Sequence, residues 1–249
     1  MMKVFFKYSD GFITISKSVA EDIIDYIEEN NIVFDRQFKI GWFHLGADFT
    51  NKDYLDQAIS SDIKGIFTNK TFIMVGSIEP RKGHEVVLSA FEKLWSLGYN
   101  YNLCILGTIG AMVERFIERI KNHEELNKRL FFIETPPDDE LTYCYKNASA
   151  LIFASRAEGF GLPIIEAAQF NLPLILSDIP VFKEIAGDNA VYFKVFDCDA
   201  LAEALIKWNR LDEQGEALDS SRIKFHTWEE AFKQITDVVI GENWYKVYD

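Results

Sequence analysis

The segment that decides the fold is Ala150–Glu166, which reads ALIFASRAEGFGLPIIE. It begins with an apolar run over Ala150–Ala154 and then passes through a turn that contains Gly159 and Gly161. Glycines allow a tight turn and a close approach of the backbone to a ligand. Pro163 suits the first turn of a helix, where its missing N–H group is not needed. The segment therefore predicts a buried strand, a glycine turn and a helix whose N-terminus can hold an anion.

The same alternation of an apolar run and a helical pattern extends outward from this segment in both directions. The runs are Thr71–Val75, Leu103–Leu106, Leu130–Ile133, Ala150–Ala154, Leu174–Leu176 and Ala190–Phe193. The helical patterns are Gly83–Leu97, Met112–His123, Asp138–Lys146, Leu162–Phe170, Val181–Ile185 and Cys198–Trp208. The runs are apolar throughout, as parallel strands covered on both faces are. The pattern predicts an α/β fold with a doubly wound, Rossmann-like parallel sheet.

The two ends of the chain read differently from this repeat. In residues 1–48, strands are predicted over Gly11–Ser16 and Phe38–Leu45, with a helix between them, which is too little for a domain. Residues 49–70 are polar and irregular and are predicted to be a linker, and residues 71–226 form the α/β domain. Residues 227–249 are predicted to be the helix Trp228–Ile240 and an aromatic tail.

Composition excludes several classes of function. The 249 residues include 26 Lys+Arg and 39 Asp+Glu, for a net charge of −13, and 48% are hydrophobic. This balance argues against disorder, against nucleic acid as a partner and against a broad electrostatic hold on anionic lipid. Three scattered cysteines indicate a reduced, cytoplasmic compartment, and no apolar run is long enough to span a membrane. The four histidines are scattered, so no metal site is predicted.

An acidic protein that binds a phosphorylated ligand must concentrate its cations at one place. The stretch Val75–Gly83, VGSIEPRKG, has two adjacent cations, Arg81 and Lys82, between a buried strand and a helix. Ligands of open α/β sheets bind at the carboxyl ends of the strands, where this stretch lies. The pair is therefore a candidate phosphate site, although two neighbouring cations in a loop are usually only a solvated pair.

Two carboxylates bracket the glycine turn. Glu158 lies in the loop and Glu166 about one turn into the helix, followed by Ala167 and Ala168. Carboxylates accept hydrogen bonds from sugar hydroxyls, and the turn between them suits a phosphate. The layout favours a nucleotide sugar as ligand; the alternative is an ordinary surface acid and an ordinary acid on a helix face.

These segments resemble the donor-binding, C-terminal half of retaining GT-B glycosyltransferases of family 4. Glu158–Glu166 matches the E-x7-E motif of that family, Gly76–Gly83 matches its diphosphate loop, and Asp178–Glu184 matches the strand-to-helix segment that follows. The sequences of these segments are most similar to those of bacterial polysaccharide mannosyltransferases that build surface chains such as O-antigen. Many members carry arginine at the position of Ser77, so this chain has one phosphate contact fewer.

The resemblance implies a role for each matched residue. Arg81 and Lys82, with Gly76 and Ser77, are expected at the donor diphosphate, and Glu158 at the hydroxyls of the donor sugar. The catalytic residues would be Glu158, Arg81 and Lys82. The expected contacts of the sugar and distal phosphate are the backbone of Gly159, Phe160, Gly161 and Leu162. Glu166 is expected at the ribose, and Glu134 and Thr135 at the base. The donor implied is GDP-mannose, with no cofactor or metal.

The resemblance also implies what lies outside these motifs. The first 48 residues resemble only the last strand, helix and strand of the family's acceptor domain. The chain is therefore expected to be a donor half that is inactive or weakly active alone, whether as part of a longer protein, as a truncated product or as one subunit of a split enzyme. Its partners would be a glycan or lipid-linked acceptor, a separate acceptor domain and further copies of itself, in the cytoplasm or at the inner face of the membrane.

Two alternatives stay open at this point. One is a non-catalytic donor-binding subunit of a split glycosyltransferase. The other is a sugar-nucleotide epimerase of the same architecture, although the E-x7-E spacing and the Pro-Arg-Lys-Gly loop argue against it.

Overall fold

The computed structural model describes residues 2–47 and 59–249, and these fall into two compact units. The larger unit comprises the described part of Phe49–Glu158 together with Pro163–Ile223. The smaller one comprises the described part of Met1–Asp48, the loop Gly159–Leu162 and the C-terminal segment Lys224–Asp249. Each unit has its own sheet and its own core, and each is described by itself.

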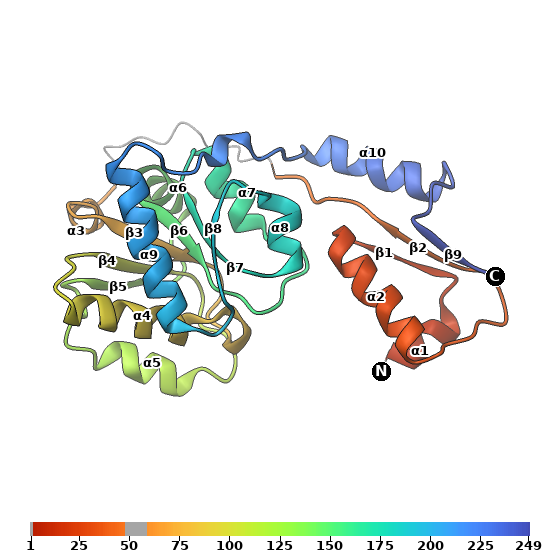
Figure 1. Ribbon diagram of the computed structural model, residues 1–249, viewed down its shortest axis with the longest axis horizontal. Helices are drawn as coiled ribbons and strands as arrows, with labels where there is room; N and C mark the ends of the chain where they lie inside the picture. The colour runs from red at the N-terminus through yellow and green to blue at the C-terminus, as the bar shows by residue number, and fades with distance from the viewer. Residues whose placement is uncertain (1, 48–58) are drawn as a thin grey trace. The chain divides into compact units, whose positions relative to one another are not determined.

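The larger unit is built on a six-stranded parallel sheet with strand order β5-β4-β3-β6-β7-β8 (Figure 1). The strands are β3 (Thr71–Val75), β4 (Asn102–Leu106), β5 (Leu130–Ile133), β6 (Ala150–Phe153), β7 (Leu174–Ser177) and β8 (Val191–Phe193). All six predicted strands are present, and every residue of β3, β4, β6 and β7 is buried. The doubly wound, Rossmann-like fold predicted from the apolar runs is confirmed.

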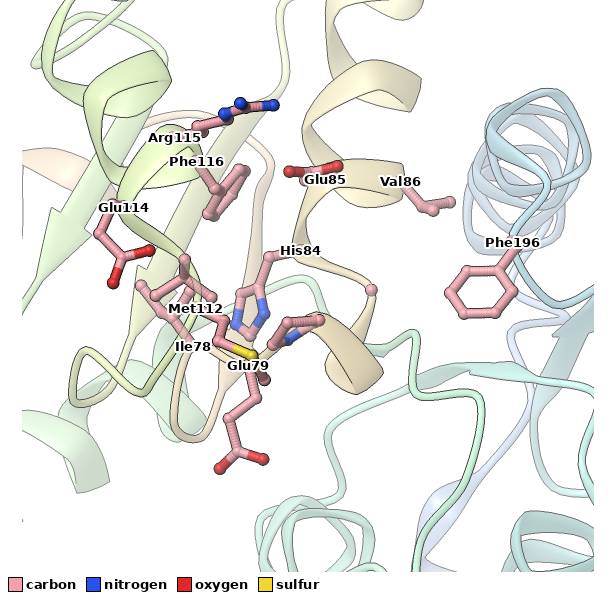
Figure 2. Close-up of a pocket in the computed structure, with 13 residues that line it drawn as sticks. Ile78, Glu79, His84, Glu85, Val86, Met112, Glu114, Arg115, Phe116 and Phe196 are labelled. Atoms are coloured by element: carbon pink, nitrogen blue, oxygen red, sulfur yellow. The ribbon is translucent and has the colours of Figure 1, made fainter.

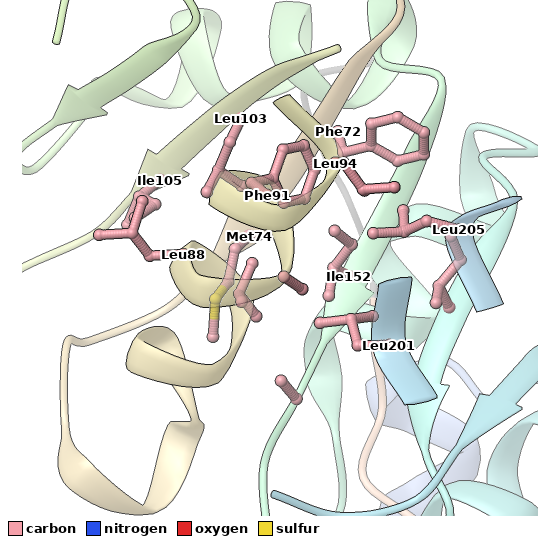
Figure 3. Packing of buried hydrophobic residues seen from close by; sticks show 14 of the residues in the cluster. Phe72, Met74, Leu88, Phe91, Leu94, Leu103, Ile105, Ile152, Leu201 and Leu205 are labelled. Atoms are coloured by element: carbon pink, nitrogen blue, oxygen red, sulfur yellow. The ribbon is translucent and has the colours of Figure 1, made fainter. Parts of the chain in front are cut away.

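Helices connect the strands and cover both faces of this sheet. They are α4 (His84–Ser96), α5 (Glu114–Lys121), α6 (Asp138–Asn147), α7 (Leu162–Gln169), α8 (Pro180–Ala186) and α9 (Cys198–Glu213). One core cluster joins alternate strand residues, such as Phe72, Met74 and Ile152, to the inner faces of α4 and α9 (Figure 3). Buried residues of α5 belong to the same cluster. Phe153, the residue after Ile152, points to the opposite face of the sheet and stacks on Phe182 of α8, with ring centroids 4.7 Å apart.

One prediction about the elements of this unit is wrong. Residues 49–70 were expected to be irregular, but Ser61–Ile66 form a helix, α3, whose N-cap Ser60 accepts a hydrogen bond from the N–H of Ile63. Six residues with two buried isoleucines are too few to show a helical period in the sequence. The part of this prediction that concerns residues 49–58 lies outside the described residues.

The smaller unit has a three-stranded sheet of order β1-β2-β9, made by Gly11–Thr14, Phe38–Trp42 and Lys246–Tyr248. Its helices are α1 (Met2–Tyr8), α2 (Lys17–Glu29), which is capped by Ser16, and α10 (Trp228–Val239). The aromatic tail was predicted without a strand, but β9 pairs antiparallel with β2. The three residues of β9 are too few to show a strand pattern in the sequence, and two of them are exposed. The strand forms because β2 offers it an edge to pair with.

Candidate functional site

The first part of the candidate site lies where two neighbouring strands end. Strands β3 and β6 are parallel partners, so the loops that follow them leave the same edge of the sheet. The loop after β3 contains a short 3-10 turn, η2 (Pro80–Lys82), and the backbone N–H of Arg156, after β6, donates to the carbonyl of Arg81 at 2.9 Å. Gly83 closes the turn with φ of 74°, and a Cβ there would lie 2.4 Å from the Ala154 carbonyl oxygen. The two loops are thus held together by backbone contacts.

The predicted cations converge on one carboxylate. Arg81 Nη1 lies 2.7 Å from Glu158 Oε2, and Lys82 Nζ lies 3.0 Å from Glu158 Oε1. The Ser155 hydroxyl also donates to Glu158 Oε1, at 2.8 Å. Lys82 is 9% exposed and its ammonium lies 5.1 Å from the centre of the Phe153 ring. The sequence thus placed these cations at the correct edge but missed that a carboxylate pairs with both.

Glu79 is a member of the cluster that sequence reasoning did not single out. Its carboxylate accepts a hydrogen bond from Ser77 Oγ at 2.5 Å and pairs with Arg81 Nε at 2.9 Å. The hydrogen bond from Ser77 is the main reason that the pKa of Glu79 lies below its usual range, with Arg81 and Lys82 adding to the effect against partial burial. Arg81 therefore lies between the carboxylates of Glu79 and Glu158, which fix the plane of its guanidinium. The alternation of Glu79 and Arg81 along the loop was the feature of the sequence from which their pairing could have been predicted.

The side chain of Lys82 explains why residue 76 is a glycine. It has φ of 132°, and a Cβ at this position would lie 3.3 Å from Lys82 Nζ. A side chain at residue 76 would therefore press on the ammonium group. The glycine keeps open the path by which Lys82 reaches the edge of the sheet.

Glu166 lies on α7, one turn beyond its start, and is mostly buried. Burial raises the pKa of its carboxyl, against a hydrogen bond from Tyr145 and the positive charge of Lys82, which lower it. Tyr145 of α6 donates its hydroxyl to Glu166 Oε2 at 2.6 Å. This partner was also missed, because a tyrosine inside the run TYCY of a helix reads as an ordinary core residue.

The two residues predicted to contact the base follow β5. Glu134 and Thr135 are exposed, and β4 separates their strand from β3. Two strand spacings amount to about 10 Å, so these residues lie apart from the cation cluster. Thr135 has φ of 52°, which is unusual for a β-branched side chain. Such strained backbone is often found where a loop is shaped for a ligand.

Replacing Thr135 with glycine is expected to stabilise the protein by about 1 kcal/mol, because relief of roughly 1–3 kcal/mol of strain exceeds the ~0.5–1 kcal/mol entropic cost of glycine. Thr108→Gly is the matched control: it lies in the loop after β4 and its φ is not in the left-handed region. The control should be destabilised. Urea denaturation measures both, and equal destabilisation of the two variants would contradict the strain.

The predicted glycine turn follows Glu158 directly but belongs to the smaller unit by its contacts. The Ser16 hydroxyl donates to the Gly159 carbonyl at 2.7 Å, and the ring of Phe160 lies 5.4 Å from that of His44. Gly161 has φ of 116°, in the region that favours glycine. The backbone of this turn therefore favours glycine at position 161 with or without a ligand. Helix α7 begins at the next residue, Leu162.

A cavity of about 410 Å³ opens beside the 3-10 turn η2 (Figure 2). It is lined by Ile78, Glu79, Pro80, Gly83, His84, Glu85, Val86, Met112, Val113, Glu114, Arg115, Phe116 and Phe196. His84 is buried there, and burial lowers its pKa to about 4, so its imidazole is neutral near pH 7. Apart from Glu79, this lining shares no residue with the cluster around Glu158, and it offers one cation among three carboxylates. The cluster around Glu158, which carries two cations, is therefore the better candidate than the cavity for binding a phosphorylated ligand.

The family follows from a comparison with known proteins. The sequence pattern described as "Glycosyl transferases group 1" matches residues 56–224, more than half of the chain. The chain belongs to this family. Among the described residues, no helix is both long enough and apolar enough to cross a membrane.

Curated relatives include bacterial mannosyltransferases. The chain is 42% identical over 236 residues to the serotype-specific mannosyltransferase WbdA of Escherichia coli, with 90% of this chain and 28% of that protein covered. It is 36% identical over 122 residues to the O-antigen chain mannosyltransferase RfbU of Salmonella typhimurium, with 49% of this chain and 33% of that protein covered. The chain thus spans about a third or less of the length of these relatives.

Solved structures show the same fold at low sequence identity. Sucrose-phosphate synthase from Thermosynechococcus elongatus superposes with a TM-score of 0.74 at 19% identity, over 97% of this chain and 60% of the other. Anabaena HepE in complex with UDP and glucose gives a TM-score of 0.73 at 13% identity, over 96% of this chain and 65% of the other. The likeness places the fold among GT-B glycosyltransferases.

Proposed function

We propose that the chain is the donor-binding part of a retaining mannosyltransferase that uses GDP-mannose in the synthesis of a surface polysaccharide. The observation that carries the proposal is the pairing of Arg81 and Lys82 with the first glutamate of the E-x7-E motif, Glu158, at the shared edge of β3 and β6. The mannosyltransferase relatives support the sugar, and the family supports the transfer of a glycosyl group.

Each group of the cluster then has a chemical role. Arg81 and Lys82 bind the diphosphate and stabilise the negative charge that develops on it as the bond to the sugar breaks. When the donor binds, the Glu158 carboxylate gives up its ion pairs with Arg81 and Lys82 and accepts hydrogen bonds from the hydroxyls of the sugar instead. A carboxylate readily accepts two such hydrogen bonds. Glu166 accepts hydrogen bonds from the ribose. The proposal assigns no step to a metal ion.

The donor is proposed to extend along the edge of the sheet. The distance of about 10 Å between the ends of β5 and β3 suits a nucleoside diphosphate whose base lies at Glu134 and Thr135. Its phosphates then lie at Arg81 and Lys82. The acceptor, a glycan or a lipid-linked glycan, is proposed to be held by a separate domain that faces this edge.

A panel of nucleotides tests the proposal. GDP-mannose at about 100 times its dissociation constant should stabilise the protein by about 2.7 kcal/mol, seen as a rise in the thermal midpoint. GDP, UDP, ADP, dTDP and their sugars are compared at equal concentration. A response to GDP-mannose above all others supports the donor, a larger response to another nucleotide sugar changes its identity, and no response to any of them overturns the proposed function.

A further inference from the structure

Glu166 is held by a residue that lies on a different helix. Tyr145, near the end of α6, donates its hydroxyl to Glu166 Oε2 at 2.6 Å. Its side chain is 1% exposed, and its ring stacks on Phe170 with centroids 5.8 Å apart and planes 12° from parallel. Packing thus fixes the tyrosine ring, and the hydroxyl that donates to Glu166 is held in one position.

Only one of the two carboxylate oxygens is engaged by this bond. An ionised carboxylate has about four acceptor sites, so Oε1 and the remaining site on Oε2 can still accept hydroxyl groups. A free glutamate side chain samples several rotamers, and ordering it costs conformational entropy. A glutamate that the protein has already ordered does not lose that freedom when a ligand binds.

We propose that Tyr145 is a positioning residue for the donor: its hydroxyl orients the Glu166 carboxylate so that the other oxygen is presented to the two ribose hydroxyls. The inference rests on the proposed function, because it deepens the role given there to Glu166. Tyr145 itself touches no reacting atom.

The hydrogen bond also acts on the charge of Glu166. The groups that act on this carboxyl are Tyr145 from α6 and Lys82 from η2, and both lower its pKa against the larger effect of burial. Burial, then the charge of Glu166, keeps the pKa of Tyr145 well above its usual range, with Cys144 adding to this, so the phenol remains a neutral donor. Without Tyr145 the pKa of Glu166 rises further, and the protonated carboxyl loses an acceptor.

The position of Tyr145 also links two parts of the donor. Helix α6 begins at Asp138, directly after the loop that contains Glu134 and Thr135. The helix that carries the base loop therefore also carries the group that orients the ribose acid. A shift of α6 is expected to change the contacts of base and ribose together.

The test compares two ligands in the Tyr145→Phe variant of the 249-residue chain. Phenylalanine keeps the stacking on Phe170 and removes only the hydroxyl. By calorimetry, the variant should bind GDP about tenfold more weakly than the original protein, but bind 2′,3′-dideoxy-GDP with unchanged affinity, since that ligand lacks the ribose hydroxyls. Tyr143→Phe, which removes a hydroxyl from the same helix, is the matched control and should bind both ligands as the original protein does.

A pH titration from about pH 4.5 to about pH 8 provides the second measurement. GDP binds the ionised form of Glu166, so its advantage over dideoxy-GDP is present above the pKa of Glu166 and is lost as the pH falls through that value. In Tyr145→Phe this loss should begin at a higher pH. The ratio of the two affinities cancels the titration of the phosphate groups, which both ligands share.

The outcomes separate the two proposals. If the original protein binds no nucleoside diphosphate, the proposed function fails. If it prefers GDP to dideoxy-GDP and Tyr145→Phe keeps the same preference and the same pH dependence, the positioning role is overturned. Should Tyr145→Phe not fold, Glu166→Gln provides the test, since its preference for GDP should be small and independent of pH; a strong, pH-dependent preference would exclude Glu166, and therefore Tyr145, from ribose binding.

Discussion

Replacing Lys82 with methionine is expected to weaken the binding of GDP by about ten- to a hundredfold. Lys82 is 9% exposed, and a hydrogen bond from a buried cation to a phosphate is worth roughly 1.5–3 kcal/mol. Methionine keeps an unbranched apolar stem against the Phe153 ring, over which the ammonium now lies at 5.1 Å. Glu158 retains Arg81 and Ser155 as partners. The loss should therefore reflect the missing charge and not a missing fold.

Calorimetry with three ligands gives this prediction its specificity. Because the ammonium acts on phosphate oxygens, GDP, UDP and inorganic pyrophosphate should lose affinity by the same factor. Lys93→Met is the matched control: Lys93 lies on the outer face of α4, 2.8 Å from Asp199, and its loss should leave all three affinities unchanged. An unchanged affinity of Lys82→Met for GDP, with the thermal midpoint intact, would remove Lys82 from the diphosphate site.

The sheet could be predicted from the sequence because its four central strands, β3, β4, β6 and β7, are buried on both faces. Such a strand is apolar at nearly every position, and a run such as TFIMV at Thr71–Val75 between two helical patterns is typical of a buried parallel strand. The small elements could not be predicted. Strand β9 and helix α3 are too short to show a period in the sequence, and β9 forms only by pairing with β2, which is far away in the chain.

The candidate site divides in the same way. Arg81, Lys82 and Glu158 could be placed together from the sequence, because loops that follow parallel strands leave one edge of the sheet. Their pairing could not, since it depends on rotamers that the sequence does not specify. Glu79 and Tyr145 were missed for different reasons: the first resembles any loop acid beside a cation, and the second resembles any buried aromatic residue of a helix.

The pairing of Glu158 with both cations changes what its removal should do. If Glu158 only contacted the sugar, Glu158→Gln would leave the binding of free GDP unaltered. In the structure, however, its two oxygens lie 2.7 Å from Arg81 Nη1 and 3.0 Å from Lys82 Nζ, so a diphosphate must compete with it for these cations. Glutamine can still accept from Ser155 but is uncharged. We therefore expect Glu158→Gln to bind GDP up to about tenfold more tightly than the original protein does.

The sugar-bearing donor should respond in the opposite sense, relative to GDP. Glu158→Gln gives up a charged acceptor for the hydroxyls of mannose, so the ratio of the affinities for GDP-mannose and GDP should fall by about tenfold or more. Glu166→Gln should weaken both ligands by a common factor, because both contain the same ribose, and their ratio should stay constant. Calorimetry of the two ligands on the two variants yields four affinities that decide the matter. Equal losses of GDP and GDP-mannose in Glu158→Gln would mean that Glu158 serves the phosphates and not the sugar. A lower ratio in both variants would mean that the two glutamates of the motif act as one unit, since only separate contacts with sugar and ribose let one ratio fall while the other stays fixed.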